Sequence, residues 1–158
     1  MTVRRKVFAN VLIAAVSSTM WIGIAPANAA PVTLVSALEG GAVEVPDPGD
    51  PDGSGAAEVK VNVKKEKLCF TLVVLDITLP TAAAHIHDGG AGEAGPIVVT
   101  LKAPEEVAGS GIGLATGCVK QLDRSLLRDI KANPGGFYIN VHTSDFPGGA
   151  VRGQLEAA

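Results

Sequence analysis

The chain has 158 residues, of which 18% are charged and 4% are aromatic, and its formal net charge is −3. Loss of residues 1–29 removes three cations and no acids, which leaves 10 basic against 16 acidic side chains and a charge of −6. This acidic balance excludes nucleic acid and anionic membrane as expected partners. The 129 residues that remain are enough for one hydrophobic core, so we predict a single domain over residues 30–158.

Residues 1–29 have the layout of an export signal peptide. A basic cluster at residues 4–6 precedes an apolar run at 7–24, and the sequence A-N-A at 27–29 fits the small-x-small cleavage rule. The alternative is a retained membrane anchor, which the polar residues inside the run disfavour. We therefore predict cleavage after residue 29 and a secreted or extracytoplasmic protein with no membrane attachment.

The sequence has two cysteines, Cys69 and Cys118, an even number in a chain destined for an oxidising compartment. We predict a disulfide between them. The alternatives are a buried free thiol or a metal ligand. A blue-copper centre is rejected because both methionines lie within residues 1–29, so that no axial methionine remains after cleavage.

Apolar and polar residues alternate over much of the chain with a period of two, which is typical of β-strands. Val59, Val61 and Val63 form the apolar side of a half-buried strand within residues 58–65. In residues 68–79 both alternating sets of positions are apolar, which predicts a central strand covered on both faces. Further strands are predicted at 33–39, 84–87, 96–101, 112–119, 137–142 and 150–155.

One short helix is predicted near residues 123–132. Asp123 is a suitable N-cap, Leu126, Leu127 and Ile130 share one face, and Pro134 marks the end of the helix. Because strands dominate the remaining chain, we predict an all-β fold, an antiparallel Greek-key β-sandwich or barrel.

The three histidines of the sequence are expected on one face of the sheet. Side chains alternate across a strand, so His85 and His87 share a face while Ile86 points into the core. In the strand at 137–142 the same alternation places His142 on the polar side. Same-face neighbours have Cα atoms about 6.5–7 Å apart, from which two imidazoles can reach one ion. The pattern therefore predicts all three imidazoles on the outer surface of the sheet.

Asn140, Arg152 and Gln154 are expected on this same outer face. Histidines at strand ends beside glycine turns often hydrogen-bond to loop backbone. The favoured interpretation is therefore structural: these three polar side chains and the histidines fasten two similar hairpins, within residues 85–101 and 140–155. No certain cofactor follows from it.

The alternative interpretation is a copper or zinc site. His85, His87 and His142 would be the ligands, with Asp88 as a second-shell acceptor or a fourth ligand. This arrangement requires the strand that carries His142 to lie near the first. Metal binding needs neutral imidazoles, so the affinity should fall as the pH drops through about 6.

Two other groups of residues are weaker candidates for a functional site. Asp47, Asp50 and Asp52 fall within six residues, but their spacing fits no EF-hand and a solvated turn is favoured over a calcium site. Ser144 lies two residues from His142, yet adjacency along an extended chain does not make a catalytic triad. We therefore expect a protein without enzymatic activity.

Four stretches resemble the CHRD domain, a module named from chordin that is also found in many exported bacterial proteins. They are EGGAVEVP at 39–46, LCF at 68–70, AHIHDGGAGEAGPIVVTL at 84–101 and NPGGFYINVHTSDFPGGAVRGQL at 133–155. The family has no established common activity. The resemblance therefore implies a non-enzymatic extracellular binding or structural module, whose partner is an unidentified protein or glycan.

A looser resemblance is to copper/zinc superoxide dismutase, a Greek-key barrel whose copper site uses an H-x-H pair on a strand. His85 and His87 match that pair, and His142 corresponds to a third copper ligand. The sequence holds no further histidine for a fourth ligand or for an imidazole bridge to zinc. Dismutase activity is therefore not expected, even with copper bound.

Overall fold

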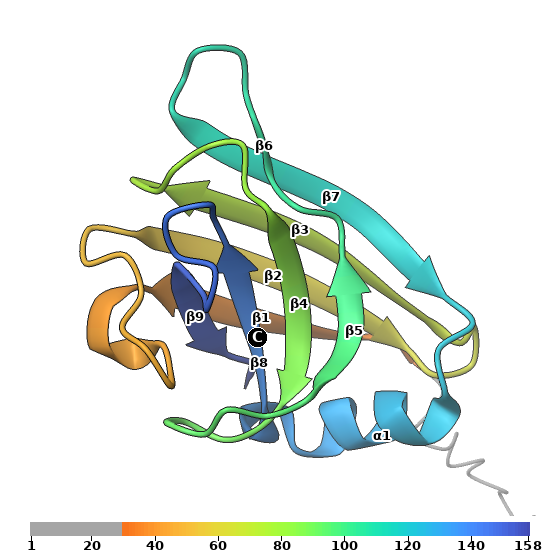
Figure 1. Cartoon of the computed structure of the whole chain (residues 1–158). Helices are drawn as coiled ribbons and strands as arrows, with labels where there is room; N and C mark the ends of the chain where they lie inside the picture. Colours follow the sequence, from red (N-terminus) through yellow and green to blue (C-terminus); the bar gives the residue numbers. More distant parts are fainter. Residues whose placement is uncertain (1–29) are drawn as a thin grey trace, which may run out of the picture.

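The computed structural model describes residues 30–158, so the predicted export signal at 1–29 lies outside the described residues. Figure 1 shows a curved β-sheet with one α-helix, α1 (Arg124–Ala132), packed against it. Short 3-10 turns occur at η1 (Gly41–Val43) and η2 (Pro134–Gly136). The strands are β1 (Val32–Glu39), β2 (Ser54–Asn62), β3 (Lys67–Leu75), β4 (Ala83–Asp88), β5 (Ile97–Leu101), β6 (Glu105–Glu106), β7 (Ile112–Lys120), β8 (Phe137–His142), β9 (Val151–Gln154) and β10 (Glu156–Ala157).

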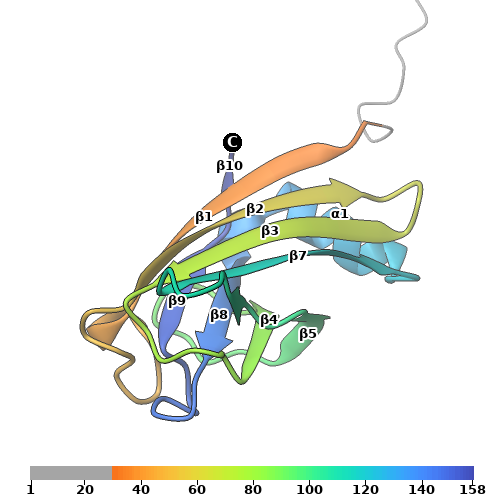
Figure 2. The same cartoon turned by 90° about the horizontal axis from the view of Figure 1, so that it is seen from above.

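The strands form one sheet in the order β5-β4-β8-β9-β1-β2-β3-β7-β6, and β10 pairs with β1 outside this path. Each pairing along that order is antiparallel. β9 lies beside β1, the first strand of the β1-β2-β3 meander. Figure 2 shows the sheet curling so that β4, β5, β8 and β9 lie opposite β1, β2, β3 and β7. The predicted all-β fold with one short helix is confirmed.

The core fills the concave side of this curled sheet. Val59 and Val61 of β2 are fully buried, as is Ile86 of β4, which confirms the alternation predicted for both strands. The helix adds Leu127 and Ile130 to the same cluster. Its N-cap is the predicted one, because the Asp123 carboxylate accepts hydrogen bonds from two backbone N–H groups of the first turn. One hydrophobic cluster therefore joins the helix to both halves of the sheet.

The prediction that residues 68–79 form a strand covered on both faces is wrong. Strand β3 ends at Leu75, and Asp76 has a positive φ of 55°. Its inward residues are buried, but Thr71 and Leu75 on the other side are exposed. The outer face of the curled sheet has no second layer over it at these positions. The apolar residues that point outward from this strand therefore form an apolar surface and not a second core.

Cys69 and Cys118 are direct cross-strand partners on β3 and β7 and form a disulfide, as predicted. The bond closes a loop with a sequence separation of 49 residues. It lies on the outer side of the sheet, opposite the core. Across residues 30–158, no helix is long and apolar enough to cross a membrane.

Candidate metal centre

The pairing of β4 with β8 brings the three histidines together. In this antiparallel register His85 is opposite Asn140, His87 is opposite Tyr138, and His142 lies diagonally beside His85. One ring nitrogen from each histidine lies within 4.8 Å of the others. Within residues 30–158, this is the one group of three or more histidine, cysteine or acidic side chains with such a geometry.

His85 and His142 face each other through ring nitrogens. His85 Nδ1 lies 3.2 Å from His142 Nε2. The other nitrogen of His142, Nδ1, lies 3.0 Å from the carbonyl oxygen of Pro147, which can only accept a hydrogen bond. His142 therefore carries its proton on Nδ1 and points the lone pair of Nε2 towards His85. A proton on His85 Nδ1 completes this contact, whereas the tautomer of His85 with its proton on Nε2 leaves lone pairs on both facing nitrogens.

His87 is held more tightly. Its Nδ1 lies 2.8 Å from the carbonyl oxygen of Gly95, and its Nε2 lies 3.0 Å from Asn140 Oδ1. The imidazole stacks on the Tyr138 ring with a centroid separation of 4.6 Å and an interplanar angle of 8°. The Gly95 carbonyl accepts a hydrogen bond from Nδ1–H, so that Nε2 carries the lone pair of the ring. Asn140 Oδ1 is itself an acceptor, so it is a close neighbour of the Nε2 lone pair and not its hydrogen-bond partner.

The electrostatics of the cluster favour neutral imidazoles. Desolvation lowers the pKa of His85 below its usual value, and the charges of His142 and His87 lower it further. Desolvation also lowers the pKa of His142, against an opposing hydrogen bond to Pro147. Both rings are therefore neutral at pH 7, which is the protonation state that binds a metal ion.

The prediction that the polar set lies on an open outer surface is wrong in part. The alternation places these side chains on the expected side, but His87 is only 8% exposed, and Asn140 and Arg152 are buried. His85, His142 and Gln154 are half-buried. The loops at 89–96 and 143–150 contact side chains of this face and cover part of it, which a period of two along a strand does not reveal.

Arg152 and Gln154 of β9 connect this face to the covering backbone. Arg152 Nη2 donates to the carbonyl of Gly90 at 2.7 Å, and the guanidinium lies 3.4 Å from the centroid of the Tyr138 ring. Gln154 Nε2 donates to the carbonyls of Gly89 at 3.1 Å and Gly135 at 2.8 Å. Asp88, in contrast, is exposed at the end of β4 and does not belong to the histidine group.

Arg152→Lys is expected to lower the free energy of unfolding by about 2 kcal/mol. A lysine keeps the charge but loses the planar stacking on Tyr138 and the Nη2 group that donates to both Gly90 and Gln154. Urea unfolding measures the change. Arg128→Lys, on the exposed side of α1, is the matched control and should be neutral; equal stability of the two variants would contradict the assigned role of Arg152.

Glu44 is a member of this polar group that the sequence patterns did not single out. It follows η1 and is 2% exposed, and its Oε2 has no hydrogen-bond partner among the described residues. Burial raises the pKa of its carboxyl to about 7, although the Val45 N–H, the Arg152 charge and Asn140 each lower it. Asn140 thus contacts both Glu44 and His87. One sequence feature could have pointed to Glu44: it is the single acidic residue within the otherwise apolar stretch A-V-E-V-P at 42–46.

A family model of the CHRD domain matches residues 34–155. The chain belongs to the CHRD family. The matched range spans β1 to β9 and includes every side chain of the histidine group and its polar surroundings, so the site is built from CHRD-domain residues throughout. No curated protein matches the chain.

Glu44 gives this CHRD domain a testable pH dependence. The folded pKa of about 7 exceeds the unfolded value of 4.5, so the folded state binds the extra proton between these values. Stability attributable to Glu44 is therefore highest below pH 4.5 and falls by about 3 kcal/mol as the pH rises to 7. Glu44→Gln should abolish this fall, measured by urea unfolding from pH 4.5 to 8. Exposed Glu39→Gln is the control, and an unchanged pH profile in the Glu44 variant would contradict the argument.

Proposed function

We propose that this CHRD chain is an exported, non-enzymatic module that binds one copper or zinc ion through His85, His87 and His142. The observation that carries the proposal is the convergence of three ring nitrogens within 4.8 Å of one another. Two ligands at about 2.0–2.1 Å from a tetrahedral ion are about 3.3–3.4 Å apart. The 3.2 Å between His85 Nδ1 and His142 Nε2 is close to that separation.

The tautomers support the same proposal. A histidine that binds a metal usually donates its other ring N–H to a backbone carbonyl, a carboxylate or water. His142 and His87 both make this contact, with Pro147 and Gly95. Each ring is thus held with Nε2 available to an ion. Imidazole donors suit both zinc and copper, and the fourth position is left to water, to Asn140 or to a partner.

Export is part of the proposal. The arguments for it are the signal-like layout of residues 1–29 and the disulfide, which persists in oxidising compartments. Cleavage after residue 29 releases a protein outside the cytoplasm, secreted or held in the cell envelope. Dismutation is not proposed, because the sequence has three histidines and therefore none for an imidazole bridge between two metals.

A second candidate function is a purely structural role for the histidines, with the domain surface binding a protein or glycan. The contacts of His87 with the Gly95 carbonyl and the Tyr138 ring favour it, because they fix the imidazole in place without an ion. Under this alternative the histidine group fastens the 89–96 loop to the sheet and binds no metal.

Isothermal titration of residues 30–158 with Zn(II) and Cu(II) at pH 7.5 distinguishes the two functions. We expect one ion per chain with micromolar or tighter affinity, and weaker binding at pH 5, where protons compete for the imidazoles. Absence of uptake for both ions at pH 7.5 would overturn the metal proposal and leave the structural role.

A further inference from the structure

Positive charge is concentrated at one end of the sheet, away from the histidine group. Five of the seven lysines within residues 30–158 belong to the β2-β3 hairpin or to the adjoining end of β7. These five are Lys60, Lys64, Lys65, Lys67 and Lys120. A chain with a formal charge of −3 thus carries a local surplus of cations on one surface.

The strand register places most of these lysines on the outer face. Lys67 is opposite Asn62 on one side and Lys120 on the other, and Lys60 is opposite Cys69. Neighbouring strands lie about 4.8 Å apart and same-face neighbours along a strand about 6.5–7 Å apart. The Cα atoms of these lysines therefore form a small two-dimensional array around the disulfide. We call Lys60, Asn62, Lys65, Lys67 and Lys120 the lysine patch.

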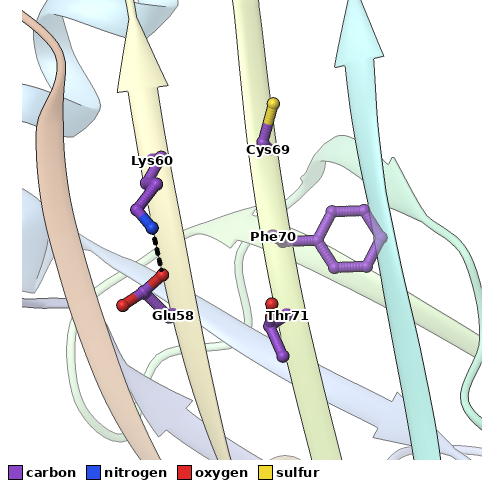
Figure 3. Close-up of a pocket in the computed structure, with 5 residues that line it drawn as sticks. All are labelled: Glu58, Lys60, Cys69, Phe70 and Thr71. Atoms are coloured by element: carbon purple, nitrogen blue, oxygen red, sulfur yellow. Dashed lines mark ion pairs between the residues drawn. The ribbon is translucent and has the colours of Figure 1, made fainter.

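The surface at the lysine patch is concave. One pocket of ≈ 260 Å³ is lined by Pro31, Lys60, Asn62, Lys65, Lys67 and Cys69. A second pocket shares Lys60 and Cys69 with it and continues along the strands past Glu58 and Thr71. Figure 3 shows Lys60 and Glu58 on β2 beside Cys69 and Thr71 on β3. The two pockets together make an elongated depression rather than a single point.

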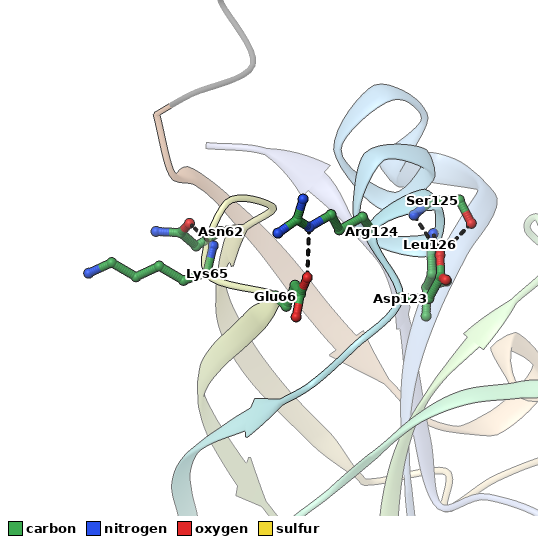
Figure 4. Close-up of polar contacts among 7 residues, drawn as sticks. All are labelled: Asn62, Lys65, Glu66, Asp123, Arg124, Ser125 and Leu126. Carbon is green, nitrogen blue, oxygen red and sulfur yellow. Dashed lines mark hydrogen bonds and ion pairs between the residues drawn. The ribbon is translucent and has the colours of Figure 1, made fainter.

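Nearby acids neutralise little of the charge. Glu58 pairs with Lys60 at 2.7 Å, and Glu66 is taken by Arg124 of α1 at 2.7 Å (Figure 4). Among residues 30–158, no carboxylate lies within 4.0 Å of the ammonium groups of Lys65, Lys67 or Lys120. Figure 4 shows the Lys65 side chain extended away from the turn, with its backbone N–H held by Asn62 Oδ1.

Export would add one more cation. Pro31 lines the larger pocket. Cleavage after residue 29 leaves Ala30 as the first residue, and its new α-amino group, with an ordinary pKa of about 7.7–8.0, is positively charged for the most part at pH 7. The contribution of this α-amino group rests on the proposed export, whereas the contribution of the lysines does not.

We propose that the lysine patch binds a linear anionic polysaccharide. The depression runs along β2 and β3, and lysine side chains line it. Ammonium groups on flexible stems suit carboxylates or sulfates on a chain that is itself flexible, since they impose no forked geometry. An acidic protein repels the uniform charge of a membrane or a duplex, whereas a narrow polymer can follow the patch alone.

The test measures binding of residues 30–158 to polygalacturonate and to heparin, with neutral dextran as a control, by biolayer interferometry in EDTA. We expect at least one anionic polysaccharide to bind, dextran not to bind, and the affinity to fall with added salt. Carboxylate and sulfate probes show which anion is preferred. Binding of neither anionic polymer overturns the proposal, as does equal binding of dextran.

The triple variant Lys65→Gln, Lys67→Gln, Lys120→Gln should bind on the order of tenfold or more weakly, with a smaller salt dependence. The control is Lys102→Gln with Lys131→Gln, which removes charge outside the patch and should change affinity little. Thermal unfolding verifies that both variants fold. Equal losses in the two variants would show non-specific attraction and overturn the proposal. Because EDTA is present, the result is independent of the metal proposal.

Discussion

His142→Ala is expected to weaken Zn(II) and Cu(II) binding by about 100-fold or more. His142 supplies the lone pair of Nε2 that faces His85 at 3.2 Å, so its removal leaves two nitrogens and one restrained ring. His85→Ala should have a similar effect for the same reason. Isothermal titration of each variant measures the loss of metal affinity. Unchanged binding in both variants would contradict the assignment of His85 and His142 as ligands.

Folding stability distinguishes the proposed metal site from a purely structural histidine cluster. His87→Ala should lose both metal binding and stability, because His87 is buried and contacts Gly95, Asn140 and Tyr138. His85→Ala should lose metal binding with little loss of stability. Asp88→Asn is the control and should bind metal like the wild type, since Asp88 lies outside the group. Loss of metal binding in the Asp88 variant would instead place Asp88 among the ligands.

The lowered pKa values also set the pH range in which the proposed metal site would release its ion. His85 and His142 remain neutral below the ordinary value of 6.5, so metal binding should persist somewhat below that pH. The same shifts affect the metal-free protein, because the folded state resists protonation of these rings. Their contribution to stability is complete above pH 6.5 and is lost as the pH falls below it, opposite in sign to that of Glu44.

Replacing Cys69 and Cys118 together by alanine is expected to lower the free energy of unfolding by about 4 kcal/mol. The physical reason is the entropy that the unfolded chain regains when a loop with a sequence separation of 49 residues opens. Urea unfolding of the oxidised wild type and the double variant measures the difference. Because β3 and β7 are paired along nine residues each, the variant should still fold.

The control for the disulfide prediction is the wild type with reductant, which should match the double variant. An unchanged denaturation midpoint on reduction would mean that the unfolded chain is already constrained, and that the loop-entropy argument does not apply. Metal binding should be retained in the double variant, since the histidines lie on β4 and β8 rather than on β3 and β7.

The sequence by itself determined the fold class, the strand positions and the face on which the histidines lie. These features depend on local rules: alternation of Val59 and Val61, the Asp123 cap and the position of Ile86 between two histidines. The cysteine pair was also predictable, because parity and compartment require no knowledge of geometry. Local rules did not place Glu44, whose burial depends on residues far along the chain.

Only the tertiary structure decided that β4 and β8 are neighbours and that their register sets His142 diagonally beside His85. It also decided that Arg152 and Asn140 are buried beneath returning loops, and that the apolar outer side of β3 is left open. The physical reason is the same in each case. Strand periodicity specifies to which face of the sheet a side chain points. Long-range strand pairing and the paths of the loops specify which residues that side chain contacts.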